Sequence, residues 1–234
     1  MKKLLTLVLS TALTGFSTAA TITQTQNYAF VPTGNVPLAF NKFDTTLGTL
    51  TSVTVSVDMT KQRGQLEVDN DSASSGTISL THQVIGDLTS SVSLVKTGGS
   101  SSVGQSGSFT AANTLSAVVG VSSGDNVLTF DATLLPDYLK FQPGTATAGD
   151  SGNIDPAFIN QYAFAGFQTF NIIMGATQTV SATGLSALQQ AFTNSDIEGK
   201  VSVVYNYTPA VIPEPASALL GGLGCLALLR RRRH

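Results

Sequence analysis

Apolar and polar residues alternate with a period of two along much of the chain. The clearest run places Val53, Val55 and Val57 between the polar residues Thr54, Ser56 and Asp58. The same alternation recurs in the segments 66–69, 78–81, 92–94, 128–130 and 201–207. Because successive side chains of a β-strand point to opposite faces, this pattern predicts strands with one buried face.

Segments rich in glycine and small polar residues separate these strands and predict turns at 60–64, 69–76, 97–108 and 144–156. The segment 97–108 is of low complexity and predicts a mobile surface loop, since alternation resumes after it. Only 185–192 has helical spacing, with apolar residues at 185, 188 and 192. Many short strands without strand–helix alternation predict an all-β fold, an antiparallel β-sandwich of jelly-roll type.

The composition narrows the classes of partner. Charged residues make up 11% of the 234 residues, against about 25% in ordinary domains. Residues 21–209 contain 13 acidic and 6 basic residues, a formal charge near −7 with no basic cluster. Nucleic acid is therefore a poor partner. The one cysteine, Cys225, lies near the C-terminus, so a domain covering 21–209 has no disulfide of its own.

The N-terminus has the three parts of a secretory signal peptide. Lys2 and Lys3 precede an apolar run over 4–13, and small residues follow up to Ala19 and Ala20. This pattern predicts a signal helix over 1–20, export through the Sec pathway, and cleavage by signal peptidase after Ala19 or Ala20. An uncleaved anchor is the alternative, but the run is shorter than the ~20 residues that a membrane span needs.

The C-terminus predicts a second membrane-directed segment over 210–234. An uncharged stretch, 216–229, follows a proline-rich motif and precedes a basic end. The prolines separate the tail from the domain, and the basic end should stay cytoplasmic. The stretch is short for a span, although arginine side chains can extend to the interface. The residues of the motif and of the basic end are Pro213, Glu214, Pro215, Arg230, Arg231, Arg232 and Arg233.

This order of Pro-Glu-Pro, apolar helix and arginine cluster resembles the PEP-CTERM sorting signal of Gram-negative bacteria. The resemblance covers about 22 residues and implies that an exosortase, a membrane enzyme, recognises the tail and processes it near 213–215. It also implies an association with exopolysaccharide and biofilm production.

Two stretches of the predicted domain resemble a second family, the choice-of-anchor E domains. Residues 40–53 follow its F-D-x-x-L-G-T-L-x-x-V opening, and 66–72 match the strand and Asn turn that come next. Residues 203–209, directly before the tail, fit as well. The resemblance covers about a third of the domain. It implies a β domain that is joined to surface-sorting tails and has no assigned enzymatic activity or cofactor.

Few residues carry candidate catalytic chemistry. His82 has the strand parity of Ile78, Leu80 and Val84, so we expect it to be partly buried on an apolar face. With no Gly-x-Ser-x-Gly motif and no second histidine before the tail, neither a Ser-His-Asp triad nor a usual zinc site is predicted. A glycosidase needs two carboxylates beside the sugar, and Glu67 and Glu198 are the only glutamates before the tail.

Two acidic turns have oxygen ligands that suit Ca²⁺. Asp69, Asn70 and Asp71 form one, and Asp150 and Asp155, with Gly152 and Asn153 between them, form the other. We favour plain Asx turns, because the glycine and distal glutamate of a calcium loop are missing. Calcium stays the alternative.

These observations predict an exported, non-enzymatic protein of the cell surface or extracellular matrix, held transiently in the inner membrane and processed by an exosortase. The alternative is a carbohydrate-binding adhesin or a cryptic hydrolase acting on exopolysaccharide. Sheet-edge self-assembly is a third expectation to test.

Overall fold

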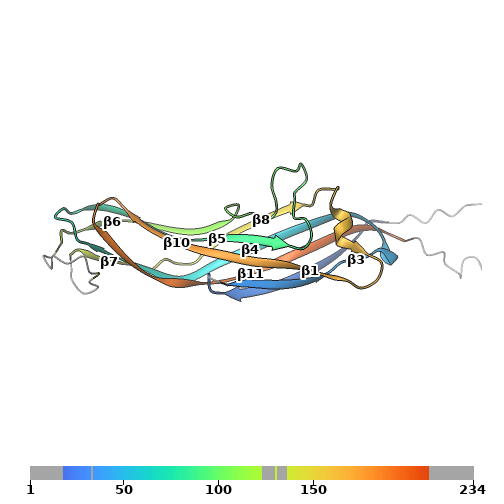
Figure 1. Cartoon of the computed structure of the whole chain (residues 1–234), viewed down its shortest axis with the longest axis horizontal. Helices are drawn as coiled ribbons and strands as arrows, with labels where there is room; N and C mark the ends of the chain where they lie inside the picture. The colour runs from blue at the N-terminus through green and yellow to red at the C-terminus, as the bar shows by residue number, and fades with distance from the viewer. Residues whose placement is uncertain (1–17, 33, 123–129, 131–135, 211–234) are drawn as a thin grey trace, which may run out of the picture.

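The computed structural model describes residues 18–32, 34–122, 130 and 136–210, and within them the chain is almost entirely extended (Figure 1). The long strands are β1 (Ala20–Phe30), β2 (Asn35–Asn41), β4 (Gly48–Asn70), β5 (Gly76–Ser90), β6 (Thr110–Val119), β8 (Ala146–Asn153), β10 (Thr169–Thr183) and β11 (Leu188–Pro209). The short elements are β3 (Phe43–Asp44), η1 (Thr45–Leu47), β7 (Tyr138–Phe141), η2 (Ile159–Tyr162) and β9 (Ala163–Phe164).

The strands form two antiparallel sheets that pack face to face. The first has the order β1-β11-β4-β7, with β8 pairing to the same edge of β4 as β7. The second has the order β2-β10-β5-β6. A parallel pair, β3 and β9, stands apart from both. The predicted all-β antiparallel sandwich is confirmed.

Consecutive strands repeatedly change sheet. β1, β4 and β11 lie in the first sheet, and their chain neighbours β2, β5 and β10 lie in the second. The pairs β1/β2, β11/β10 and β4/β5 therefore follow the same order across both sheets. Each of these pairs thus has one strand in each layer of the sandwich.

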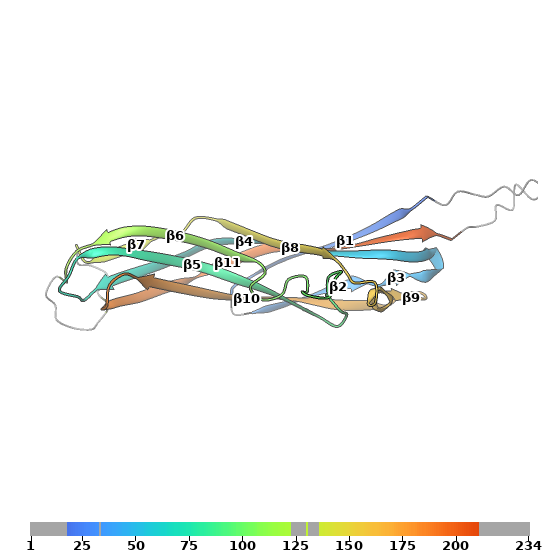
Figure 2. The same cartoon turned by 90° about the horizontal axis from the view of Figure 1, so that it is seen from above.

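The sandwich is a long rod, because four of its strands, β4, β5, β10 and β11, have 15 or more residues. β4 has 23 residues and β11 has 22, and the two pair along nearly their whole length. At about 3.3 Å per residue, β4 alone spans roughly 75 Å. Figure 2 shows β1 beginning and β11 ending at the same end of the rod, in agreement with the pairing of Ala20 with Tyr207. The β4–β5 and β10–β11 connections lie at the opposite end.

The turn predicted at 60–64 is wrong, because β4 runs through this segment. Arg63 and Gly64 take left-handed φ angles of 57° and 84°. The partner strand β11 pairs Ser195 with Arg63 and Thr193 with Gln65, which leaves Gly64 out of the ladder. The register is the same on both sides of Gly64, so the turn residues interrupt the ladder at the Gly64–Asn194 position without adding a residue, and pairing with β11 keeps the strand extended.

Other local predictions also fail where tertiary pairing outweighs local pattern. Residues 188–192, expected to be helical, begin β11, and 146–153, expected to be part of a turn, form β8. Val92 and Leu94 are buried but belong to no strand. The expected strand at 128–130 falls mainly outside the described residues. The turn at 69–76 is confirmed by the β4–β5 connection.

The segment 97–108 is a surface connection between β5 and β6, as predicted, and it is anchored to the sandwich at two points. The Val103 side chain is fully buried, and its N–H donates to the Leu94 carbonyl (2.8 Å). Gly104 accepts from the Leu88 N–H through its own carbonyl (2.8 Å). The low-complexity sequence thus folds back onto the sandwich.

Two apolar clusters fill the space between the sheets. The larger occupies the half of the rod near the chain ends and includes Val53–Met59 on β4 at alternate positions. The smaller, at the other end, contains Leu66, Val68, Ile78, Leu80 and Val119. Between them, along β4, β5 and β11, lie three fully buried polar residues, Lys61, His82 and Ser195. We call these three residues, with Asn113 on β6, the polar layer.

The predicted signal helix, the proline motif and the C-terminal apolar helix fall outside the described residues. In the described part of the chain, no helix has the length and apolar composition needed to cross a bilayer.

Candidate functional site

A shallow groove of about 710 Å³ lies on the outer face of the first sheet, across β1, β11 and β4. The strand register brings its residues together: Lys200 is opposite both Asn27 and Asp58, and Glu198 is opposite Thr60. These side chains alternate with buried neighbours on their strands and so face outward. The groove thus presents two carboxylates, an ammonium, an amide and a hydroxyl.

Tyr28 and Gly199 form the base of this groove. The Tyr28 hydroxyl donates to the Asp58 carbonyl (2.7 Å). A β-carbon at Gly199 would overlap both this carbonyl oxygen and the Tyr28 hydroxyl, so only glycine fits there. Burial, with the nearby Asp58 charge, raises the pKa of Tyr28, which keeps the hydroxyl protonated as a donor.

The charges of the groove stay in contact with water. Lys200 Nζ lies 3.6 Å from Asp58 Oδ2, and the two side chains are 54% and 64% exposed. Glu198 accepts a hydrogen bond from Gln62. An exposed ion pair of this kind contributes little to stability, so its groups are available to a ligand. The arrangement suits a polar ligand with many hydroxyl groups, bound without an apolar platform.

A second, smaller groove of about 260 Å³ lies at the end of the rod that carries both chain ends. Its walls include Phe43, Leu47, Phe167 and Tyr205, and Phe167 is 81% exposed. The Ala210 N–H donates to the Leu47 carbonyl (2.9 Å), so the last described residue leaves the sandwich beside this groove.

The calcium candidates at 69–71 form an Asx turn. Asn70 Oδ1 accepts from Ser72 N (3.0 Å) and Ser72 Oγ (2.6 Å), and its amide donates to the carbonyls of Ser74 and Gly120. Asp71 accepts from Gln189 Nε2 (2.7 Å), and Asp69 is buried. The favoured interpretation of these residues therefore has structural support: the Asn70 amide is used by the turn itself.

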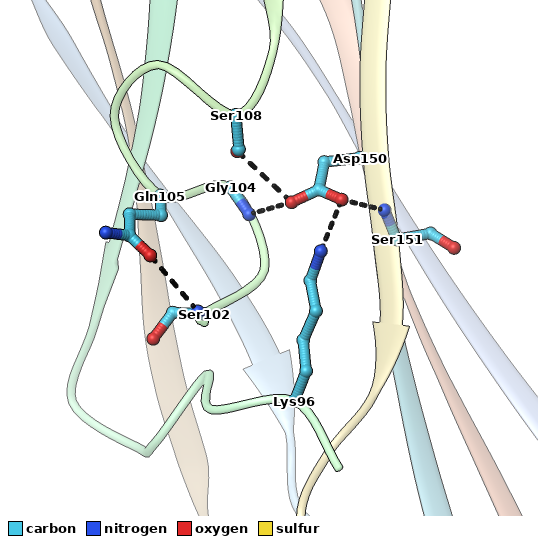
Figure 3. Close-up of polar contacts among 7 residues, drawn as sticks. All are labelled: Lys96, Ser102, Gly104, Gln105, Ser108, Asp150 and Ser151. Carbon is cyan, nitrogen blue, oxygen red and sulfur yellow. Dashed lines mark hydrogen bonds and ion pairs between the residues drawn. The ribbon is translucent and has the colours of Figure 1, made fainter. Parts of the chain in front are cut away.

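Asp150, the other calcium candidate, anchors the segment 97–108 (Figure 3). Its Oδ1 accepts from Lys96 Nζ (2.6 Å) and Ser151 N (2.8 Å). Its Oδ2 accepts from Gly104 N (2.8 Å) and Ser108 Oγ (3.2 Å). Burial acts to raise the pKa of Asp150, but the hydrogen bonds from Lys96 and Gly104 outweigh it and hold the pKa below its ordinary value.

Asp155 is not part of that contact network: its Oδ1 accepts from Ala157 N (3.0 Å). Within the described ranges, no three His, Cys, Asp or Glu side chains gather as a metal site.

His82 lies where its strand parity predicts, with the buried residues Ile78, Leu80 and Val84 on the inner face of β5. Among the described residues, neither of its ring nitrogens has a hydrogen-bond partner of good geometry, and the same holds for Ser195 Oγ. Burial, and then the charge of Lys61, lowers the pKa of His82, while the nearby Thr193 carbonyl opposes this shift. The imidazole is therefore neutral at pH 7.

The two glutamates lie far apart on β4 and β11. Glu67 is on the outer face of the first sheet, opposite Lys140, whose Nζ lies 3.5 Å from its carboxylate. Tyr138 also hydrogen-bonds to Glu67. Glu198 lines the groove. The structure therefore does not pair Glu67 with Glu198.

The sequence pattern predicted neither the groove nor the polar layer. Lys61 continues the inward series Val55, Val57 and Met59, so the alternation contained the signal, but the turn predicted at 60–64 interrupted it. The groove has no such signal, because it depends on the register of three strands that are distant in sequence. The sorting residues at 213–215 and 230–233 lie outside the described residues.

Comparison with known proteins gives no family. No family model and no curated protein matches the chain. Solved structures of infectious bursal disease virus are similar only at a low level: the Gx strain structure has 15% identity and a TM-score of 0.15, over 90% of this chain and 49% of that one. The T13 particle of the same virus has 15% identity and a TM-score of 0.14, over 86% and 41%. The chain thus spans about half the length of these viral chains.

Proposed function

We propose that this protein is an exported, non-enzymatic structural component of the cell surface or extracellular matrix. Signal peptidase would remove residues 1 to about 20 after Sec export. An exosortase would then act on the tail, through Pro213, Glu214 and Pro215, while the arginines hold it transiently in the inner membrane.

The observation that carries this proposal is the placement of both described chain ends at one end of the rod (Figure 2). Ala210, the last described residue before the tail, lies beside Leu47, and the opposite end of the rod lies roughly 75 Å away by the length of β4. A rod attached at one end extends its other end away from the membrane. This geometry suits a spacer or display element.

The outer faces suit the same role. Strand positions that face outward carry mainly Thr, Ser, Asn and Gln. Their hydroxyl and amide groups contact one another across strands, in the pairs Thr21–Asn206, Thr25–Ser202 and Asn206–Ser52. Such faces hydrogen-bond with water and with polysaccharide without relying on charge. We therefore propose exopolysaccharide as the surrounding partner.

Glu214→Ala tests the sorting step. The wild-type protein should be recovered from the cell exterior with a shortened C-terminus, whereas the variant should collect in the inner-membrane fraction with its tail intact. Glu198→Ala, which changes a glutamate of the groove, is the matched control and should be sorted like the wild type. Equal distribution and equal C-termini for wild type and Glu214→Ala would contradict the proposal.

The groove on β1, β11 and β4 favours a second candidate, a carbohydrate-binding adhesin. Its polar groups converge on one face, and they are exposed enough to exchange water for sugar hydroxyls. A hydrolase fits the groove less well, because Asp58 is paired with Lys200 and its side chain is 64% exposed, so the groove does not exclude water from this carboxylate.

Binding of purified exopolysaccharide from the producing cells tests the adhesin. The double variant Asp58→Ala/Lys200→Ala should lose the binding, and Glu67→Ala/Lys140→Ala, an ion pair elsewhere on the same sheet, should keep it. If both double variants lost exopolysaccharide binding, or if neither did, the groove would not be the binding site.

A further inference from the structure

Lys61 and Asn113 meet inside the sandwich and come from different sheets. Lys61 is on β4 of the first sheet and is fully buried; Asn113 is on β6, an edge of the second. Lys61 Nζ lies 2.6 Å from Asn113 Oδ1. Among the carboxylates of the described ranges, none forms an ion pair with Lys61. The lysine thus lies between the sheets with a neutral amide as its hydrogen-bond partner.

This setting shifts the Lys61 amine toward its neutral form. Burial lowers the pKa of Lys61, because the ammonium loses its water and gains no carboxylate. A neutral amine has a lone pair that can attack a carbonyl carbon. Since a C=O bond is about 1.23 Å long, Asn113 Cγ lies within about 3.8 Å of Lys61 Nζ. Reacting atoms that are positioned for attack lie about 3–3.5 Å apart, so the separation of Nζ and Cγ is close to that range.

The imidazole of His82 is placed to transfer protons between Lys61 and Asn113. It is the direct cross-strand partner of Asn113 in the β5–β6 pair, on the same inner face. Cross-strand partners have Cβ atoms about 4.5–5.5 Å apart. Both ring nitrogens lack a partner within the described part of the chain, and Lys61 is close enough for its charge to act on the ring. A neutral imidazole can accept a proton at one moment and return it at the next.

We propose that Lys61 and Asn113 form an intramolecular amide bond that joins the two sheets. The lone pair of Nζ attacks Asn113 Cγ and forms a C–N bond. His82 takes a proton from the attacking nitrogen and delivers it to the departing amide nitrogen. The original C–N bond of Asn113 then breaks, and one ammonia molecule leaves. No atom is oxidised or reduced, and no co-reactant is needed.

The bond supplies a covalent fastening that cysteine chemistry does not give residues 21–209, since Cys225 is the only cysteine of the sequence. It closes a segment of 52 residues between positions 61 and 113. It also replaces a buried amine and the amide that binds it with a single neutral amide group. The proposal concerns the domain alone and does not depend on its export.

Tryptic digestion of the full-length protein followed by mass spectrometry tests the bond. A linked Lys61 resists trypsin, so one product should join residues 43–63 to residues 97–140. Its mass should equal the sum of the two peptides less one ammonia molecule, and it should survive denaturant and reducing agent. Separate peptides 43–61 and 97–140, with no joined product, would overturn the proposal.

Three variants locate the chemistry. Asn113→Ala and Lys61→Met should each abolish the joined product, whereas Lys200→Met, at an exposed lysine on β11, should keep it. In His82→Gln, the joined product should accumulate more slowly in protein whose circular dichroism matches the wild type. A joined product that persists in Asn113→Ala, or linking at the wild-type rate in folded His82→Gln, would contradict the assigned roles.

Discussion

Lys61 lies between the two sheets, and Lys200 lies on the outer face of one of them. Each has an oxygen partner: Lys61 is fully buried and 2.6 Å from Asn113 of the other sheet, while Lys200 is 54% exposed and 3.6 Å from Asp58 of the neighbouring strand. Water stabilises the outer charge whether or not its partner is present. The inner amine depends on its partner entirely. The same side chain is therefore a binding group in the groove and a structural, reactive group in the polar layer.

Removing the inner partner should have the largest effect. Asn113→Ala deprives Lys61 of its hydrogen bond and prevents the proposed cross-link, whose closure of a 52-residue segment is worth about 4 kcal/mol in the chain-entropy description. Urea unfolding should show that the free energy of unfolding of Asn113→Ala is lower than that of the wild type by an amount of this order. Asp58→Ala, the outer counterpart, should change stability by less than about 0.5 kcal/mol. Similar losses of unfolding free energy in Asn113→Ala and Asp58→Ala would contradict the difference between the polar layer and the groove.

The tight packing of the polar layer can be tested at Gly64. A β-carbon there would lie 2.6 Å from His82 Cε1 and 2.7 Å from Ser195 Oγ. Gly64→Ala should therefore cost about 3 kcal/mol, from backbone strain and overpacking together. Gly107 has the same φ of 84° with nothing within 4 Å, so Gly107→Ala isolates the backbone part, about 1 kcal/mol. Thermal or urea unfolding that ranks the two variants equally would contradict the packing.

Lys96–Asp150 is the intermediate case, with side chains 25% and 13% exposed. Asp150→Asn removes the charge that holds Lys96, Gly104 and Ser108, and should cost about 1–2 kcal/mol. The local effect should be clearer than the global one: faster amide hydrogen exchange in 101–108, with the β4–β11 ladder unchanged. Uniform acceleration over the whole sandwich would show that Asp150 does not act locally.

The polar layer should also respond to pH, through His82. Burial is the first cause that lowers the folded pKa of His82 from its ordinary value of 6.5, and it acts whether or not Lys61 is linked. The charge of an unlinked Lys61 lowers the pKa further, and Ser195 and Asn113, the other polar neighbours, carry no charge. As the pH falls, His82 therefore becomes protonated in the unfolded chain at a higher pH than in the folded protein. The stability that depends on neutral His82 is complete above about pH 6.5. The free energy of unfolding decreases as the pH drops from there toward the pKa of His82 in the folded protein, by at most about 1.4 kcal/mol per pH unit.

Urea titrations at several pH values check this prediction, with His82→Gln as the reference. The wild-type curve should fall below about pH 6.5 while the variant curve stays flatter over the same interval. Parallel curves would assign the acid sensitivity to other groups.

The period-two pattern predicted the fold class because half-buried strands need it. It placed His82 on the inner face for the same reason. It failed where pairing decided the outcome: 60–64 became part of β4 because β11 pairs on both sides of Gly64, and 188–192 became strand because β4 pairs with it. The groove could not be predicted, since Asn27, Asp58 and Lys200 are brought together only by register. The contact of Lys61 with Asn113 likewise depends on how two sheets face each other.

The intact mass of the native protein recovered from the cell exterior tests the central claim of an exported and processed rod. We predict a mass that lacks residues 1 to about 20 and everything beyond 213–215, with any excess identifying an attached group. A full-length C-terminus that still carries Arg230, Arg231, Arg232 and Arg233 would make the tail a plain membrane anchor and contradict the matrix role.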